Sequence, residues 1–175
     1  MTHRRLLLTA AALALAACAS VPPAGTANVA APDDRLNATL WMQQSAEYKA
    51  NAEAVYALAS IRLGEALAAP SWTAAPEEQK AGYEALPPAI VLDADETVLD
   101  NSPYQAWMVK SGSGFSDKTW DAWAGAGEAL AVPGAVRFTN EAAAKGVTVF
   151  YVTNRDAATE DGTARNINNT QCKLT

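Results

Sequence analysis

Histidine is almost absent from this sequence, and cysteine is scarce. The single histidine is His3, which lies in an N-terminal stretch that we expect to be removed after export. The rest of the chain therefore holds no Ser–His or Cys–His nucleophile pair, no histidine phosphatase site and no zinc site with histidine ligands. The two cysteines are Cys18 and Cys172. Acylation of Cys18 would leave no partner for an intramolecular disulfide, and we expect Cys172 to be a small buried hydrophobic residue.

Basic residues are also few. Lys and Arg number 13 against 19 Asp and Glu, which gives a net charge of −6, and no segment gathers the basic residues into a stripe. A nucleic-acid partner is therefore not expected. Half of the residues are apolar, enough for a hydrophobic core, and 175 residues suit one domain or a domain with a helical appendage.

The N-terminus has the features of a bacterial export signal. Arg4 and Arg5 precede an uncharged apolar run, residues 6–17, that is too short to span a bilayer as a helix. The run ends in Leu-Ala-Ala-Cys, which resembles the lipobox of bacterial lipoproteins, so we predict a lipoprotein signal peptide over 1–18 with lipidation at Cys18. The alternative is an ordinary signal peptide with a cysteine near its cleavage site by chance.

The residues after Cys18 suggest where the anchor lies. Ala19 stands where an Asp tends to hold lipoproteins at the inner membrane, so we expect a lipid anchor in the outer membrane, with the domain facing the periplasm or the surface. Residues 19–32 are rich in Ala, Pro and Gly without periodicity, which is typical of a flexible tether. The sequence does not identify a protein partner.

The remainder, 33–175, is expected to form one domain with an N-terminal helical part at 33–86 and a core that starts at residue 87. Apolar spacing predicts one long helix, and Pro70 and Pro76 end that pattern. The stretch from residue 101 to about 130 has no regular pattern. The expected elements are a helix over about 33–68, a short helix at 77–86, a strand at 89–92, a helix from Pro133-Gly134 to Gly146, a strand at 147–152 and a polar helix at about 159–169.

A strand, a helix and a second strand in this order form a βαβ unit, whose strands should be parallel. Polar residues follow both strands directly: Asp93 and Asp95 after the first, and Thr153 and Asn154 after the second. Ligands of open α/β sheets bind beyond the carboxyl ends of the strands. We therefore expect the two clusters to face the same crevice if the strands are neighbours.

The paired carboxylates suit phosphoryl chemistry. One carboxylate of the pair Asp93 and Asp95 can act as a covalent nucleophile toward phosphorus, and the other can protonate the leaving oxygen and then activate water. Hard oxygen ligands beside a phosphate favour Mg²⁺. Thr153 and Asn154 offer hydrogen-bond donors to phosphate oxygens. The alternative is that both aspartates are merely turn or helix-cap residues. Arg155 either contacts the substrate or, as we favour, forms an ion pair at the strand end.

Two segments carry a resemblance to a known family. Residues 90–102 (IVLDADETVLDNS) resemble the first motif of the haloacid dehalogenase (HAD) superfamily in the form found in class C acid phosphatases, and residues 149–155 (VFYVTNR) resemble their second motif. This resemblance implies a Rossmann-like α/β fold with a parallel sheet and a small cap, here at about 101–131. Asp93 would be the nucleophile and a metal ligand. Asp95 would be the acid/base and reach the metal through its backbone carbonyl, and Thr153 would bind the phosphoryl group.

The same resemblance implies the substrate class. The family includes outer-membrane lipoprotein acid phosphatases and 5′-nucleotidases, so the expected substrates are phosphomonoesters, among them nucleoside 5′-monophosphates. Cap aromatics between Trp107 and Trp123 would shape the pocket or simply pack, and the sequence leaves both alternatives open.

The chain departs from the family pattern at its C-terminal end. The family needs a later lysine and a pair of acidic residues at the end of a further strand, yet only twenty residues follow Arg155, and the lysine among them is Lys173. We therefore expect a C-terminally truncated, incomplete sheet in which one edge of the first strand is bare and its apolar flank is exposed. Two alternatives to an active phosphatase are an inactive lipoprotein fragment of that family and a lipid-anchored interaction module.

Overall fold

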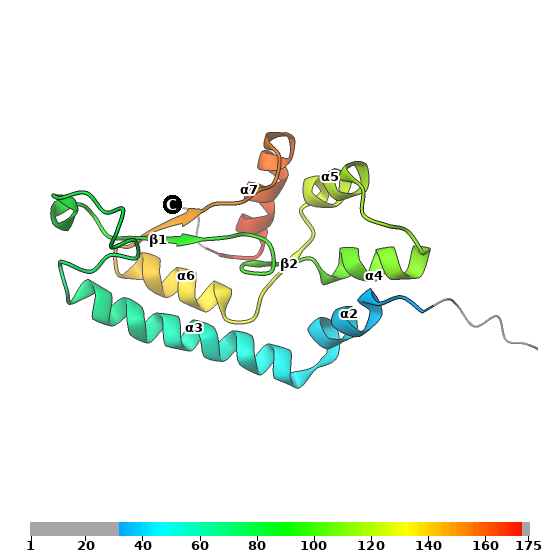
Figure 1. Ribbon diagram of the computed structural model, residues 1–175, viewed down its shortest axis with the longest axis horizontal. Helices are drawn as coiled ribbons and strands as arrows, with labels where there is room; N and C mark the ends of the chain where they lie inside the picture. Colours follow the sequence, from blue (N-terminus) through cyan, green and yellow to red (C-terminus); the bar gives the residue numbers. More distant parts are fainter. Residues whose placement is uncertain (1–31, 173–175) are drawn as a thin grey trace, which may run out of the picture. The chain divides into compact units, whose positions relative to one another are not determined.

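The computed structural model describes residues 32–172. They form a two-stranded parallel sheet, a small pair of antiparallel strands and several helices (Figure 1). None of the helices in this described part is long and apolar enough to cross a membrane. The elements are α2 (Arg35–Gln44), α3 (Ala46–Leu67), η1 (Tyr83–Ala85), β1 (Ala89–Leu92), β2 (Leu99–Asp100), α4 (Ser102–Ser111), α5 (Asp117–Ala126), β3 (Leu130–Ala131), α6 (Ala135–Ala144), β4 (Thr148–Tyr151), η2 (Ala157–Thr159) and α7 (Glu160–Asn169).

The strands β1 and β4 form the predicted parallel pair. Their register pairs Ala89 with Thr148 and Leu92 with Tyr151, so both strands end at the same edge of the sheet. The N–H of Val152 extends the ladder by donating to the carbonyl of Leu92 at 2.8 Å. The α/β class and the parallel βαβ arrangement expected from the sequence are therefore confirmed.

One face of this sheet is covered. Helix α6 packs against β4, and α3 packs against α6, as Figure 1 shows. The inward-facing side chains of the strands join the core with residues of both helices, because alternate residues of a strand point to the same face. This core includes Ile90, Leu92, Val149 and Tyr151 from the strands, Tyr56 and Leu63 from α3, and Phe138 and Ala142 from α6.

The other face of the sheet is exposed. Val91, Phe150 and Val152 retain 66%, 53% and 60% of their accessible surface, and Val91 and Phe150 are direct neighbours in the register. Within residues 32–172, β1 pairs with β4 alone. The expected bare edge and exposed apolar flank of β1 are thus confirmed for this part of the chain.

The long helix predicted over 33–68 is wrong at one position, because it is two helices that meet at Ser45. Ser45 is extended (φ −77°, ψ 139°), and its hydroxyl accepts a hydrogen bond from the N–H of Tyr48 at 3.0 Å. A serine in this role stabilises the start of a helix by satisfying an N–H group that has no partner within the helix. The short helix expected at 77–86 is also wrong, since only the 3-10 turn η1 forms there.

The stretch from residue 101 to about 130, expected to be irregular, contains α4 and α5. Ser116 caps α5 by accepting from the N–H of Thr119 at 3.3 Å. Gly112 and Gly127 end the two helices in the left-handed conformation, at φ 64° and 68°, which glycine adopts without strain. The antiparallel pairing of β2 with β3 brings the two ends of this insertion together, because Leu99 lies opposite Ala131.

The later elements agree with the sequence predictions. Helix α6 starts after Gly134, and Gly146, at φ 77°, follows its end. Strand β4 and helix α7 lie within the predicted ranges 147–152 and 159–169. The predicted signal peptide, Cys18 and nearly all of the predicted tether lie outside the described residues, as does Lys173. Cys172 is buried, with 3% exposure, as predicted.

Candidate active site

Asp93 is the first residue after β1, at the start of a tightly bonded turn. The carbonyl of Ala94 accepts hydrogen bonds from the N–H groups of Val98 at 2.9 Å and Leu99 at 2.8 Å. The N–H of Glu96, which has a left-handed φ of 55°, donates to the carbonyl of Leu99 at 2.9 Å. Ala94 and Val98 are fully buried, so the turn is anchored in the core. This anchoring fixes the backbone on which Asp93 and Asp95 sit.

Glu96 has a structural position in this turn. Its Oε1 accepts a hydrogen bond from the N–H of Asn101 at 3.1 Å and thereby closes the loop after Asp95. Although the residue is partly open to solvent, burial of its carboxyl group inside the loop raises the pKa of Glu96, while the hydrogen bond from Asn101 acts in the opposite direction.

Asp95 is held by a charged and a neutral donor. The guanidinium of Arg155 donates from Nη2 to Oδ1 at 2.6 Å and from Nε to Oδ1 at 3.1 Å and Oδ2 at 3.2 Å. The Nδ2 of Asn101 donates to the same Oδ1 at 2.7 Å. The side chains of Arg155 and Asp95 are 2% and 17% exposed. The ion pair that the sequence favoured for Arg155 is confirmed, and its partner is Asp95.

Arg155 also ties together elements that are far apart in sequence. Its Nη1 donates to the hydroxyl of Thr163 on α7 at 3.1 Å, and its guanidinium lies 5.2 Å from the centre of the Trp120 ring on α5. Its Nη2 reaches Oδ1 of Asn101 at 3.3 Å, and that oxygen also accepts from Nε1 of Trp123 at 2.8 Å. The acid/base candidate Asp95 is therefore connected to α5 of the insertion and to α7.

Thr153 and Asn154 lie at the same end of the sheet as Asp93, since β1 and β4 are parallel and in register. Thr153 is half-buried, and its hydroxyl accepts from the N–H of Arg155 at 3.2 Å, while Asn154 is exposed. The structure thus places all four predicted site residues beyond the carboxyl ends of two adjacent strands. It joins only Asp95 to other side chains, and no hydrogen bond within the described part links Thr153 or Asn154 to Asp93.

The oxygen atoms around Asp93 fit a hard cation in part. Asp93 is exposed, and no described side chain donates to its carboxylate. None of the backbone hydrogen bonds of the turn uses the carbonyl of Asp95. Both oxygen types suit Mg²⁺. Within residues 32–172 no group of three or more acidic, His or Cys side chains gathers to hold a metal, so the described residues offer an incomplete set of ligands.

The cap aromatics pack around one buried tyrosine. The ring of Tyr104 lies 5.7 Å from Trp107, 5.3 Å from Trp120 and 6.4 Å from Trp123. Packing is therefore the role seen for these tryptophans. Trp107 and Phe115 keep 43% and 62% of their surface exposed, so their rings remain open to solvent.

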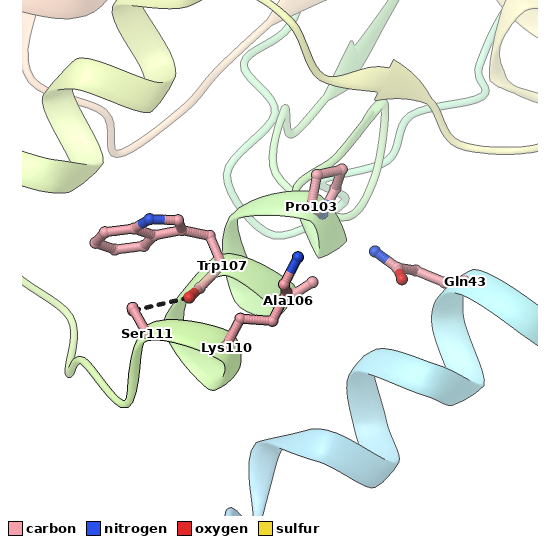
Figure 2. A pocket seen from close by; sticks show the side chains of 6 residues that line it. All are labelled: Gln43, Pro103, Ala106, Trp107, Lys110 and Ser111. Atoms are coloured by element: carbon pink, nitrogen blue, oxygen red, sulfur yellow. Dashed lines mark hydrogen bonds between the residues drawn. The ribbon is translucent and has the colours of Figure 1, made fainter.

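A shallow hollow lies between α2 and α4, as Figure 2 shows. In that view the side chain of Gln43 points from α2 toward α4, and the indole of Trp107 extends from α4 on the side away from Gln43. The lining also includes Pro103, Ala106 and Ser111. Asp93, Asp95, Thr153 and Asn154 do not line this hollow, whereas Trp107 of the cap does.

Sequence reasoning missed three residues of the site. Asn101 was given no role of its own from the sequence, although its position six residues after Asp95 in the first motif was a usable signal. Trp123 and Thr163 contact the site through Asn101 and Arg155 from distant helices. No local pattern marks them.

The comparisons with known proteins agree with this geometry. The family model described as HAD superfamily, subfamily IIIB (acid phosphatase), matches residues 3–173. The chain is similar to the class C acid phosphatase from Bacillus anthracis, with 39% identity to a crystal structure with tungstate bound and 40% identity to a second structure of it, each at a TM-score of 0.66. Each match covers 79% of this chain and 52% of the other, so the chain spans about half the length of these relatives. The HAD-like fold class expected from the two motifs is confirmed, and the chain belongs to the subfamily IIIB acid phosphatases of the HAD superfamily.

Proposed function

We propose that this chain carries the catalytic nucleophile of a Mg²⁺-dependent acid phosphatase that hydrolyses phosphomonoesters. The observation that carries the proposal is the position of Asp93 and Asp95 directly after β1, with Thr153 after the parallel neighbour β4. Family membership supports a phosphoric monoester hydrolase. Because the chain spans about half of its solved relatives, the activity of these residues is part of the proposal.

Two steps follow from the carboxylates. An oxygen of Asp93 attacks phosphorus, the bond from phosphorus to the ester oxygen breaks, and Asp95 gives its proton to the departing alcohol. Asp95, now ionised, takes a proton from water while that water attacks the phosphorus of the aspartyl phosphate. The second step releases inorganic phosphate and restores both carboxyl groups to their starting protonation states.

The remaining site residues would bind the phosphoryl group. The hydroxyl of Thr153 and the amide of Asn154 are the donors available at the end of β4. The carboxylate of Asp93 and the carbonyl of Asp95 would hold Mg²⁺, which, when bound, offsets the negative charge of the phosphate and of Asp93. Further oxygen ligands would have to come from substrate, water or residues outside the described part.

The substrate and the location are finer parts of the proposal. Open rings of Trp107 and Phe115 in the insertion are suited to stacking on a base, so nucleoside 5′-monophosphates are the proposed substrates among phosphomonoesters. Acylation at Cys18 would attach the protein to the outer membrane, and the signal-like residues 1–18 support this location.

A second candidate is that this chain alone has no turnover. The exposed apolar face formed by Val91, Phe150 and Val152 supports it, because a parallel sheet is normally covered on both faces. An interaction module, the third alternative, gives no reason for Asp93 and Asp95 to follow a buried strand in this way.

The test is phosphatase activity of the full chain, measured with and without Mg²⁺ beside an Asp93→Asn variant. We expect hydrolysis of a nucleoside 5′-monophosphate that needs the ion and falls by at least about 10³-fold in the variant, since the nucleophile is lost. Equal rates in the two proteins would reject Asp93 as nucleophile. No turnover in either would favour the second candidate.

A further inference from the structure

The two oxygens of the Asp95 carboxylate have different surroundings. Oδ1 accepts from Nη2 and Nε of Arg155 at 2.6 and 3.1 Å and from Nδ2 of Asn101 at 2.7 Å. Among residues 32–172, Oδ2 accepts only the long bond from Nε at 3.2 Å. A carboxylate oxygen has about two lone-pair sites, so Oδ1 is saturated and Oδ2 is not.

Asn101 has one orientation that satisfies both of its side-chain groups. Its Oδ1 accepts from Nε1 of Trp123 at 2.8 Å and from Nη2 of Arg155 at 3.3 Å. Both of these neighbours are donors only, so the amide nitrogen of Asn101 must point toward Asp95. Trp123 on α5 therefore determines which group Asn101 presents to the carboxylate.

Arg155 has no role as a direct substrate ligand in this arrangement. All three of its guanidinium nitrogens donate to protein oxygens, on Asp95, Asn101 and Thr163. Its side chain is 2% exposed, and the ring of Trp120 lies 5.2 Å from its guanidinium carbon. The planar fork of an arginine can fix the plane of a carboxylate, which a lysine ammonium cannot do.

We propose that Arg155 and Asn101 are positioning residues that hold Asp95 by Oδ1, so that Oδ2 is the oxygen that gives and takes the proton. Trp123 extends this control into the insertion, because α5 orients Asn101 through the indole N–H. This inference rests on the proposed function for its catalytic consequence, whereas the holding of Asp95 itself is independent of turnover.

The kinetic test compares Arg155→Lys and Trp123→Phe with Arg62→Lys in the full chain. Arg62 is the matched control, because it also pairs with a carboxylate, Glu65, and lies 4.8 Å from a tryptophan ring, but it belongs to α3. We expect kcat to fall about 10²-fold in Arg155→Lys and about tenfold in Trp123→Phe, as for loss of acid/base positioning. KM and the Kd for tungstate should stay within about threefold of wild type, and Arg62→Lys should match wild type.

A loss of tungstate affinity parallel to the loss of kcat would overturn the proposal, because Arg155 would then bind the phosphoryl group. An unchanged kcat in Arg155→Lys would overturn it as well. A merely structural role would lower the thermal midpoint without separating kcat from KM.

A second readout decides the matter if the wild-type chain has no turnover, a result that counts against the proposed function alone. In the ¹⁵N-labelled full chain, the Nε–H proton of Arg155 should exchange with water at least about tenfold more slowly than that of exposed Arg62, because it is buried and bonded to a carboxylate. Asp95→Ala should remove most of this protection, and Arg62 should not change. Equal exchange of the two arginines in the wild-type chain would show that Arg155 does not hold Asp95.

Discussion

The hydroxyl of Tyr56 on α3 donates a hydrogen bond to the backbone carbonyl of Thr97, in the turn that carries Asp93 and Asp95. The Tyr56 ring lies 5.6 Å from Phe138 on α6 and rests against Gly134, where a Cβ atom would come within 2.9 Å of the ring carbon Cδ2. The N-terminal helix α3 is therefore part of the support for the acidic turn. It cannot be regarded as a separate appendage.

This bond predicts a stability effect that depends on pH. Burial raises the pKa of Tyr56 to about 12 from 10.0. A raised folded-state pKa means that the contribution of Tyr56 is complete below pH 10 and is lost as the pH rises toward 12. We expect Tyr56→Phe to cost about 1 kcal/mol near pH 8 through loss of the hydrogen bond, and the gap from wild type to close between pH 10 and 12.

Urea unfolding at several pH values measures this gap. Tyr151, whose pKa burial also raises to about 12, is present in both proteins and largely cancels in the comparison, because the charge of Tyr56 is the smallest cause of its shift. A gap that is constant up to pH 12 would show that the Tyr56 hydroxyl does not support the turn in its protonated form.

Asn166 on α7 predicts a large cost for a small change. Its side chain is 2% exposed, donates to the carbonyl of Ala129 at 2.7 Å and accepts from the N–H of the same residue at 3.1 Å. Asn166→Asp removes the donor and buries a charge, so we expect a loss of at least about 2 kcal/mol in unfolding free energy at pH 7. Asn168→Asp, exposed on the same helix, should stay within about 0.5 kcal/mol of wild type. Equal urea midpoints for the two variants would contradict the role of Asn166.

Gly162 predicts how closely α7 must approach α5. A Cβ atom at this position would lie 2.7 Å from the carbonyl oxygen of Ala124 and from the Cα of Gly125. Gly162→Ala should therefore push α5 away and cost about 1–3 kcal/mol. Gly64→Ala in α3 meets nothing within 4 Å and should stabilise the protein by about 0.5–1 kcal/mol. Thermal unfolding measures both stability changes. If the two variants were both stabilised or both destabilised, the close contact between α7 and α5 would be rejected.

The exposed sheet face predicts self-association. Val91→Thr with Phe150→Thr keeps residues that favour strands but makes this face polar, so we expect less association in light scattering and stability within about 0.5 kcal/mol. The control changes Leu58 and Ile61 of α3, which are 58% and 62% exposed, to Gln. A helix face lacks unpaired strand edges, so the control should have a smaller effect. If both double variants reduced association to a similar extent, exposed apolar residues in general, and not this sheet face, would be the cause of the association.

Local sequence was sufficient wherever short-range chemistry decides the structure. The apolar residues of β1 and the β-branched and aromatic residues of β4 predicted both strands, and Gly134 and Gly146 predicted the limits of α6. The acidic pair after β1 was predicted for the same reason, since its position depends only on where the strand ends.

The break at Ser45 and the helices α4 and α5 were missed, because their signals are single capping residues within long or irregular patterns. Ser45 and Ser116 each provide one hydroxyl that caps the start of a helix. Such a cap contributes only about 1 kcal/mol, so the packing around it decides whether a helix starts there. Apolar periodicity carries no information about a break of this kind.

Only the tertiary structure decided which groups surround Asp95. The sequence determined that Asp95 follows β1 and that Arg155 follows β4, but it left Arg155 a choice between substrate and an ion pair. Parallel pairing of the strands places the two side chains together, and α5 and α7 then exclude water around Arg155 and use its remaining donors. The sequence alone cannot make this choice, because the energy of a buried charge depends on the partners that the complete fold provides.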